Sequence, residues 1–61
     1  MFEIGKKYKI QDLQDIYYTA TIISETEHAI FFTDLNGQRI GLAKQEIKRW
    51  KEIENSTEGE Y

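Results

Sequence analysis

Basic side chains gather near the end of this chain in a pattern suited to contacting a polyanion. Four of them lie in one short stretch: Lys44, Lys48, Arg49 and Lys51. Lysine and arginine neutralise phosphates, and exposed aromatic rings offer a surface on which unpaired bases stack. Tyr8, Tyr17 and Trp50 could supply such rings. The pattern therefore predicts a site for RNA or another single-stranded nucleic acid, made of Lys44, Lys48, Arg49, Lys51 and Tyr17.

A second basic group near the start of the chain bears on the same site. It consists of Lys6, Lys7 and Lys9. If the first and last strands pair, the outward bases of the two groups lie together. The alternative is that these bases only keep strand edges from pairing with other sheets.

The sequence contains no catalytic or metal-binding pattern. His28 is the only histidine and there is no cysteine, so the usual ligands of a zinc site are missing. Glu25 and Glu27, the acids nearest to His28, do not have a recognisable catalytic spacing. We therefore expect a binding protein with no enzyme activity, no metal and no cofactor, in which His28 is a solvated turn residue.

Two pairs of consecutive aromatic residues suggest an interface. Phe31 and Phe32 are adjacent, as are Tyr17 and Tyr18, so one member of each pair must point away from the core. Exposed apolar surface on a small protein often marks a contact with a partner. Phe31 and Tyr17 are the predicted interface residues, and self-association, as a C2 dimer in the first instance, is expected. The alternatives are a protein-interaction module that docks on a larger assembly, and a monomer whose outer ring lies against a loop.

Length and charge limit the classes of protein that the chain can form. Sixty-one residues make one domain, expected at 1–53, and three glutamates without a base mark 54–61 as a flexible acidic tail. The tail accounts for the net charge of −3. It would aid solubility or, alternatively, compete with nucleic acid for the basic residues. No apolar run approaches the length of a membrane helix or a signal sequence, and with no cysteine the expected location is cytoplasmic.

The basic and aromatic residues must be positioned by strands, because β-branched and aromatic residues dominate the apolar runs. The predicted strands are Lys7–Ile10, beginning at Lys6 or Lys7, then Ile16–Ser24, Ala29–Thr33, Gln38–Leu42 and Lys48–Ile53. Asn36-Gly37 predicts a tight hairpin turn, because both residues tolerate positive φ. A 3₁₀ turn is expected within Ala43–Ile47, and Leu13 is expected to pin the loop at Gln11–Asp15. Short connections between five strands favour an all-β barrel that closes to remove its edges, whereas a helical bundle conflicts with the Asn-Gly turn.

From Lys6 to Ile53 the pattern resembles the SH3-like small barrels. Gly41–Ile47 is similar to the point where such barrels leave the fourth strand, make a 3₁₀ turn and bury an aliphatic residue, here Ile47. The peptide-binding branch has a tryptophan at the start of the third strand and a proline in the 3₁₀ region. This chain has Ala29 and Ala43 near those places and no proline, so the resemblance does not imply recognition of proline-rich peptides.

Thr19–Phe32 followed by Lys44–Ile47 also resembles the Sm/Hfq family, which has the same strand order. The bacterial Hfq turn reads Tyr-Lys-His-Ala-Ile, and Lys44 and Ile47 match it while the intervening residues do not. Thr26-Glu27-His28 stands where that family has Asp-Gln-Phe, and the N-terminal helix of Hfq is missing. The resemblance implies a ring that contacts RNA through two loops, with Lys44 as the position that carries over.

Overall fold

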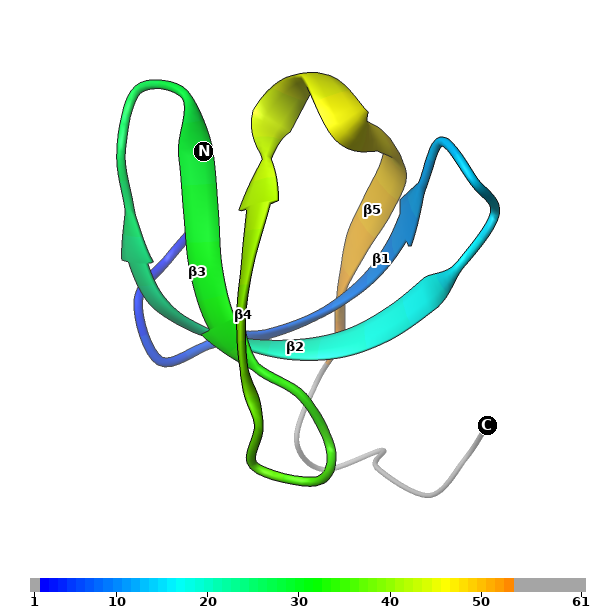
Figure 1. Cartoon of the computed structure of the whole chain (residues 1–61). Coiled ribbons are helices and arrows are strands. Elements are labelled where there is room, and N and C mark those ends of the chain that lie inside the picture. Colours follow the sequence, from blue (N-terminus) through cyan, green and yellow to red (C-terminus); the bar gives the residue numbers. More distant parts are fainter. Residues whose placement is uncertain (1, 54–61) are drawn as a thin grey trace.

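The computed structural model describes residues 2–53, which form five antiparallel strands and one 3₁₀ turn (Figure 1). The elements are β1 (Lys7–Asp12), β2 (Tyr17–Glu25), β3 (Ala29–Thr33), β4 (Arg39–Ala43), η1 (Lys44–Glu46) and β5 (Ile47–Ile53). The predicted all-β fold, with a 3₁₀ turn before the last strand, is confirmed. The tail predicted at 54–61 lies outside the described residues.

The strands form one sheet in the order β4-β3-β2-β1-β5. This arrangement is compatible with an SH3-like small barrel. The prediction that the sheet closes is wrong, because β4 and β5 do not pair with each other. η1 redirects the chain after β4, and β5 instead pairs with β1 along its whole length, from Lys7 to Asp12.

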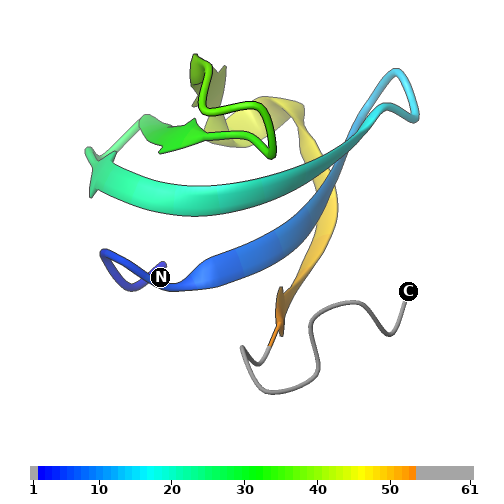
Figure 2. The ribbon, with the colours of Figure 1, turned by 90° about the horizontal axis from the view of Figure 1, so that it is seen from below.

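β2 is the strand that bends the sheet around its core. Its first half pairs with β1 and its second half pairs with β3, with an irregularity between Ile22 and Ser24. Such a bulge increases the local twist of a strand, and Figure 2 shows β2 as a long curved strand above β1. Ala20, at the middle of β2, is completely buried, in keeping with the small side chain expected inside the bend.

The core lies inside this bend and is made of alternate side chains of the strands. Its buried residues are Phe2, Tyr8, Ile10, Ala20, Ile22, Ile30 and Phe32, and Tyr18, Ile40, Leu42 and Ile47 pack against them. Phe32 has no solvent exposure, whereas Phe31 is 41% exposed. Tyr18 likewise packs against the core while Tyr17 is 61% exposed. The prediction that each aromatic pair divides between two faces is confirmed.

The hairpin between β3 and β4 lies where Asn36-Gly37 predicts it. Gly37 has a φ of +79°, while Asn36 keeps a negative φ. The carboxylate of Asp34 accepts hydrogen bonds from the N–H groups of Asn36 and Gln38, both at 2.9 Å. These bonds stabilise a three-residue loop in which only the glycine needs the left-handed conformation.

The loop between β1 and β2 is organised by a buried carboxylate. Asp12 Oδ1 accepts hydrogen bonds from the N–H groups of Gln14 and Ile16, both at 2.9 Å. Its other oxygen accepts a bond from the Tyr18 hydroxyl at 3.2 Å. Leu13 is 56% exposed, so the prediction that it pins this loop is wrong. Asp12 does so instead, and β1 consequently continues two residues beyond the predicted end at Ile10.

Candidate nucleic-acid interface

The pairing of β1 with both β2 and β5 builds a polar face on the outside of the sheet. Lys9 lies opposite Lys51 on β5 and opposite Thr19 on β2. The next outward residue of β1, Gln11, pairs with Arg49 and Tyr17. Because side chains alternate along a strand, these residues share the face opposite to the buried Tyr8 and Ile10. We call this surface the outer face; it consists of Lys9, Gln11, Tyr17, Thr19, Arg49 and Lys51.

A cavity of about 380 Å³ lies on the outer face. It is lined by Lys9, Gln11, Tyr17, Arg49, Trp50 and Lys51. Lys9 Nζ lies 5.9 Å from the centroid of the Tyr17 ring, close enough for a cation–π contact. The cavity therefore brings three cationic side chains to an exposed aromatic ring. Its size falls within the range of roughly 300–1,000 Å³ that is usual for small-molecule sites.

Within residues 2–53, neither Arg49 nor Lys51 takes part in an ion pair. Lys9 and Lys51 occupy directly opposed positions on neighbouring strands, an arrangement that like charges make unfavourable.

A second cavity of about 350 Å³ adjoins the first, because both are lined by Arg49 and Trp50. Lys44, Ile47 and Lys48 complete its lining. The five residues predicted to bind nucleic acid are thus divided between two adjoining cavities on β5. Tyr17, Arg49 and Lys51 line the outer-face cavity, while Lys44 and Lys48 line the second one.

Lys48 makes an ion pair within the chain. Its Nζ lies 2.8 Å from Asp15 Oδ1. The hydrogen bond from Lys48 and the charge of that lysine hold the pKa of Asp15 below its ordinary value of 3.8, and the charge of Arg49 adds a smaller effect. Asp15 has a φ of +66° in the β1–β2 loop. The contact connects this loop to β5 beside the outer face.

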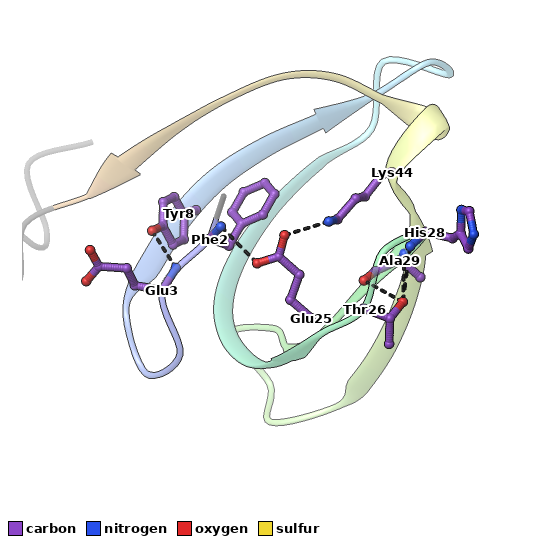
Figure 3. Close-up of polar contacts among 8 residues, drawn as sticks. All are labelled: Phe2, Glu3, Tyr8, Glu25, Thr26, His28, Ala29 and Lys44. Atoms are coloured by element: carbon purple, nitrogen blue, oxygen red, sulfur yellow. Dashed lines mark hydrogen bonds and ion pairs between the residues drawn. The ribbon is translucent and has the colours of Figure 1, made fainter.

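Lys44, the first residue of η1, also makes an ion pair (Figure 3). Its Nζ lies 2.6 Å from Glu25 Oε2, while Glu25 Oε1 accepts a hydrogen bond from the Phe2 N–H at 3.0 Å. Glu25 therefore joins η1, the end of β2 and the N-terminal segment. The hydrogen bond from Lys44, followed by the bond from Phe2, holds the pKa of Glu25 below its ordinary value of 4.5.

The aromatic residues have unequal access to a ligand. Tyr8 is buried, so the prediction that it offers a stacking surface is wrong. Its ring packs edge-on against Phe2 and Trp50, with centroids 4.9 and 5.8 Å away. The Tyr8 hydroxyl accepts a hydrogen bond from the Glu3 N–H (Figure 3). Trp50 remains 41% exposed beside this cluster, and Tyr17 is the most exposed ring of the outer face.

Gln11 is the site residue that the sequence analysis missed. The pattern around it, with two acids and two glutamines, indicated a surface loop. The structure places Gln11 in β1 with only 7% of its surface exposed. Its Nε2 donates a hydrogen bond to Asp15 Oδ1 at 3.1 Å, while its Oε1 is buried and has no hydrogen-bond partner. Even spacing from Lys9 was the signal that could have placed it on the outer face.

The two predicted interface residues do not form one patch. Phe31 pairs with Ser24, near the end of β2, whereas Tyr17 begins that strand. The Phe31 ring lies over Gly41, where an added Cβ would come within 2.9 Å of the ring. Ile23, which is also partly exposed, is next to Ser24 in sequence. Phe31 thus lies over β4, apart from Tyr17.

His28 is exposed on the β2–β3 loop, 3.9 Å from the carboxylate of Glu27. Residues 2–53 contain no group of three or more side chains that could hold a metal ion. In the same part of the chain, no helix is long and apolar enough to cross a membrane. Comparison of the sequence and structure with protein-family models, curated proteins and solved structures finds no match.

Proposed function

We propose that this protein is a small, non-catalytic binding module that contacts RNA or single-stranded nucleic acid through the outer face. The observation that supports this function is the convergence of Lys9, Arg49 and Lys51 with the exposed Tyr17 ring around one cavity. Cationic side chains neutralise phosphates, and an aromatic ring stacks on a base of any sequence. A duplex keeps its bases stacked inside, so the Tyr17 ring favours a single strand.

The second cavity extends the basic surface along β5 and gives a strand a path of several nucleotides. Lys44 and Lys48 line it, and each keeps its charge next to one acid of the chain. The resemblance of Lys44 and Ile47 to the Sm/Hfq turn agrees with an RNA ligand. A cytoplasmic location, where RNA is abundant, forms part of the proposal.

Fluorescence anisotropy with labelled RNA and single-stranded DNA oligomers at low salt tests the function. We expect dissociation constants in the micromolar range, with weaker binding to a duplex of the same length. Tyr17→Leu should weaken binding by removing the stacking surface. No binding at tens of micromolar protein would refute the proposal.

The exposed Phe31 ring favours a second function, the binding of a protein partner or of a second copy. Phe31 exposes 41% of its surface even though its ring rests on Gly41. Light scattering over a range of concentrations tests self-association, and Phe31→Ser should abolish it. If the wild-type chain and Phe31→Ser are both monomeric at high concentration, and neither retains a protein partner, this function is excluded.

A further inference from the structure

Two features of the outer face bear on what it can bind. Lys9 and Lys51 oppose each other across β1 and β5, and Gln11 Oε1 is buried without a hydrogen-bond partner. A buried acceptor that loses water without gaining a donor is costly. Both features lie at the same cavity, which Lys9, Gln11 and Lys51 line together.

The orientation of the Gln11 amide is fixed by its neighbour. Asp15 Oδ1 is an oxygen acceptor that already receives Lys48 Nζ, so the Gln11 atom 3.1 Å away must be the donor, Nε2. The other atom of the amide, Oε1, is therefore the one without a partner. A ligand that satisfies Gln11 must bring an N–H or O–H group.

The cavity also limits the size of its occupant. At about 380 Å³ it is near the lower end of the range for small-molecule sites, which suits one nucleotide rather than several. A nucleotide carries the three groups that the lining requires. It has an anion for the lysines, a planar ring for Tyr17 and hydrogen-bond donors on its base and ribose.

From these observations we infer that the outer-face cavity is a subsite for one nucleotide of the bound strand. Its phosphate lies between Lys9 and Lys51, its base stacks on Tyr17, and a donor on the base or the ribose 2′-hydroxyl reaches Gln11 Oε1. The inference rests on the proposed function and adds that binding has a defined one-nucleotide site, beyond general attraction of a polyanion.

Nitrogen-15 NMR titration of the full chain with AMP, dAMP, ribose 5-phosphate and inorganic phosphate tests the subsite. Inorganic phosphate should shift the backbone signals of Lys9 and Lys51 only. AMP should also shift those of Tyr17 and the side-chain amide of Gln11, and bind at least tenfold more tightly than inorganic phosphate. If the shift of the Gln11 amide is lost with dAMP, the 2′-hydroxyl is the donor. If it is kept with dAMP and lost with ribose 5-phosphate, the donor is on the base.

A pair of variants separates contact with the ligand from an effect on the loop. Gln11→Met removes the acceptor and the bond to Asp15, whereas Asp15→Ala removes that bond and the ion pair with Lys48 but keeps the acceptor. If Oε1 receives the ligand, Gln11→Met lowers the preference for AMP over inorganic phosphate by about three- to tenfold, the worth of one hydrogen bond, and Asp15→Ala preserves it. Equal losses of preference in both variants would overturn the role of Gln11.

The wild-type titration keeps the inference testable even if Gln11→Met does not fold. If the Gln11 amide does not move with any nucleotide while RNA oligomers still bind, the subsite is refuted and the proposed function stands. If neither mononucleotides nor RNA oligomers bind, both are refuted.

Discussion

Replacing Lys51 by glutamine should weaken nucleic-acid binding while making the fold more stable. The structure places Lys51 directly opposite Lys9, so the substitution removes one side of a like-charge pair. Relief of such a pair stabilises a sheet by roughly 0.2–1 kcal/mol. In a domain of this size, that corresponds to a rise in melting temperature of about 1–8 °C.

The loss of binding follows from the number of ion pairs that cationic side chains of the site make with phosphates of the bound strand. Lys9, Arg49 and Lys51 line the cavity and give three contacts. For a single strand the logarithm of affinity falls with the logarithm of salt at about 0.7 per contact, so three contacts predict a slope of about −2.1. Raising salt from about 50 to about 200 mM then weakens binding about 18-fold. With Lys51→Gln the slope becomes about −1.4 and the loss about sevenfold.

The assay is fluorescence anisotropy at several salt concentrations, together with thermal melts monitored by circular dichroism. Arg39→Gln is the matched control, because it removes one exposed positive charge from β4, outside both cavities. We expect the control to leave the salt slope unchanged. If Arg39→Gln and Lys51→Gln reduce the slope equally, only net charge matters and the outer face is not the site. A lower melting temperature for Lys51→Gln would contradict the opposed arrangement of the two lysines.

Three further predictions concern stability, pH and the acidic end of the chain. The pKa values of Glu25 and Asp15 are lowered in the folded state, so their contribution to stability is present at neutral pH and is lost as pH falls below 4.5 and 3.8 toward the lowered values. Thermal melts across that range measure the loss, and Glu25→Gln should make it smaller. Phe32→Ala removes a fully buried ring and costs about 3–5 kcal/mol, detectable by urea denaturation, whereas the exposed Phe31→Ala costs less. Deleting 54–61 removes three carboxylates and no base, and should increase affinity for RNA at low salt in anisotropy measurements.

Each of these has an outcome that contradicts it. A melting temperature independent of pH below 4.5 would mean that the ion pairs of Glu25 and Asp15 do not stabilise the fold. Equal costs for Phe31→Ala and Phe32→Ala would contradict their assignment to opposite faces. If the truncated chain binds RNA with unchanged affinity at low salt, the acidic residues do not oppose the ligand.

Much of the fold could be predicted because its determinants are local. Because side chains alternate along a strand, one of Phe31 and Phe32 had to be buried and the other exposed, and the pair divided as expected. The Asn36-Gly37 hairpin was placed correctly, although the side chain of Asp34 selected a three-residue loop. Closure of the sheet could not be predicted from local sequence, because it depends on which strands β5 pairs with. In the sheet, β5 pairs with β1 alone.

Most residues of the candidate site could be predicted from the sequence, but their arrangement in space could not. Arg49, Lys51 and Tyr17 were recognised from residue type. They were expected to lie beside the basic residues of the first strand if the first and last strands paired. Lys44 and Lys48 were recognised in the same way, yet each faces an acid from a distant loop or strand. No local pattern indicates such partners, since Lys48 and Asp15 are far apart in the sequence.

The sequence alone determined that this chain forms short β-strands, where it turns, and that its cationic residues concentrate near both ends. These properties depend on side-chain shape and on neighbours within a few positions. Only the tertiary structure decided that Gln11 is buried and that Lys9 meets Lys51. The register between β1 and β5 sets both, because a shift of one residue would turn every outward side chain of a strand toward the core.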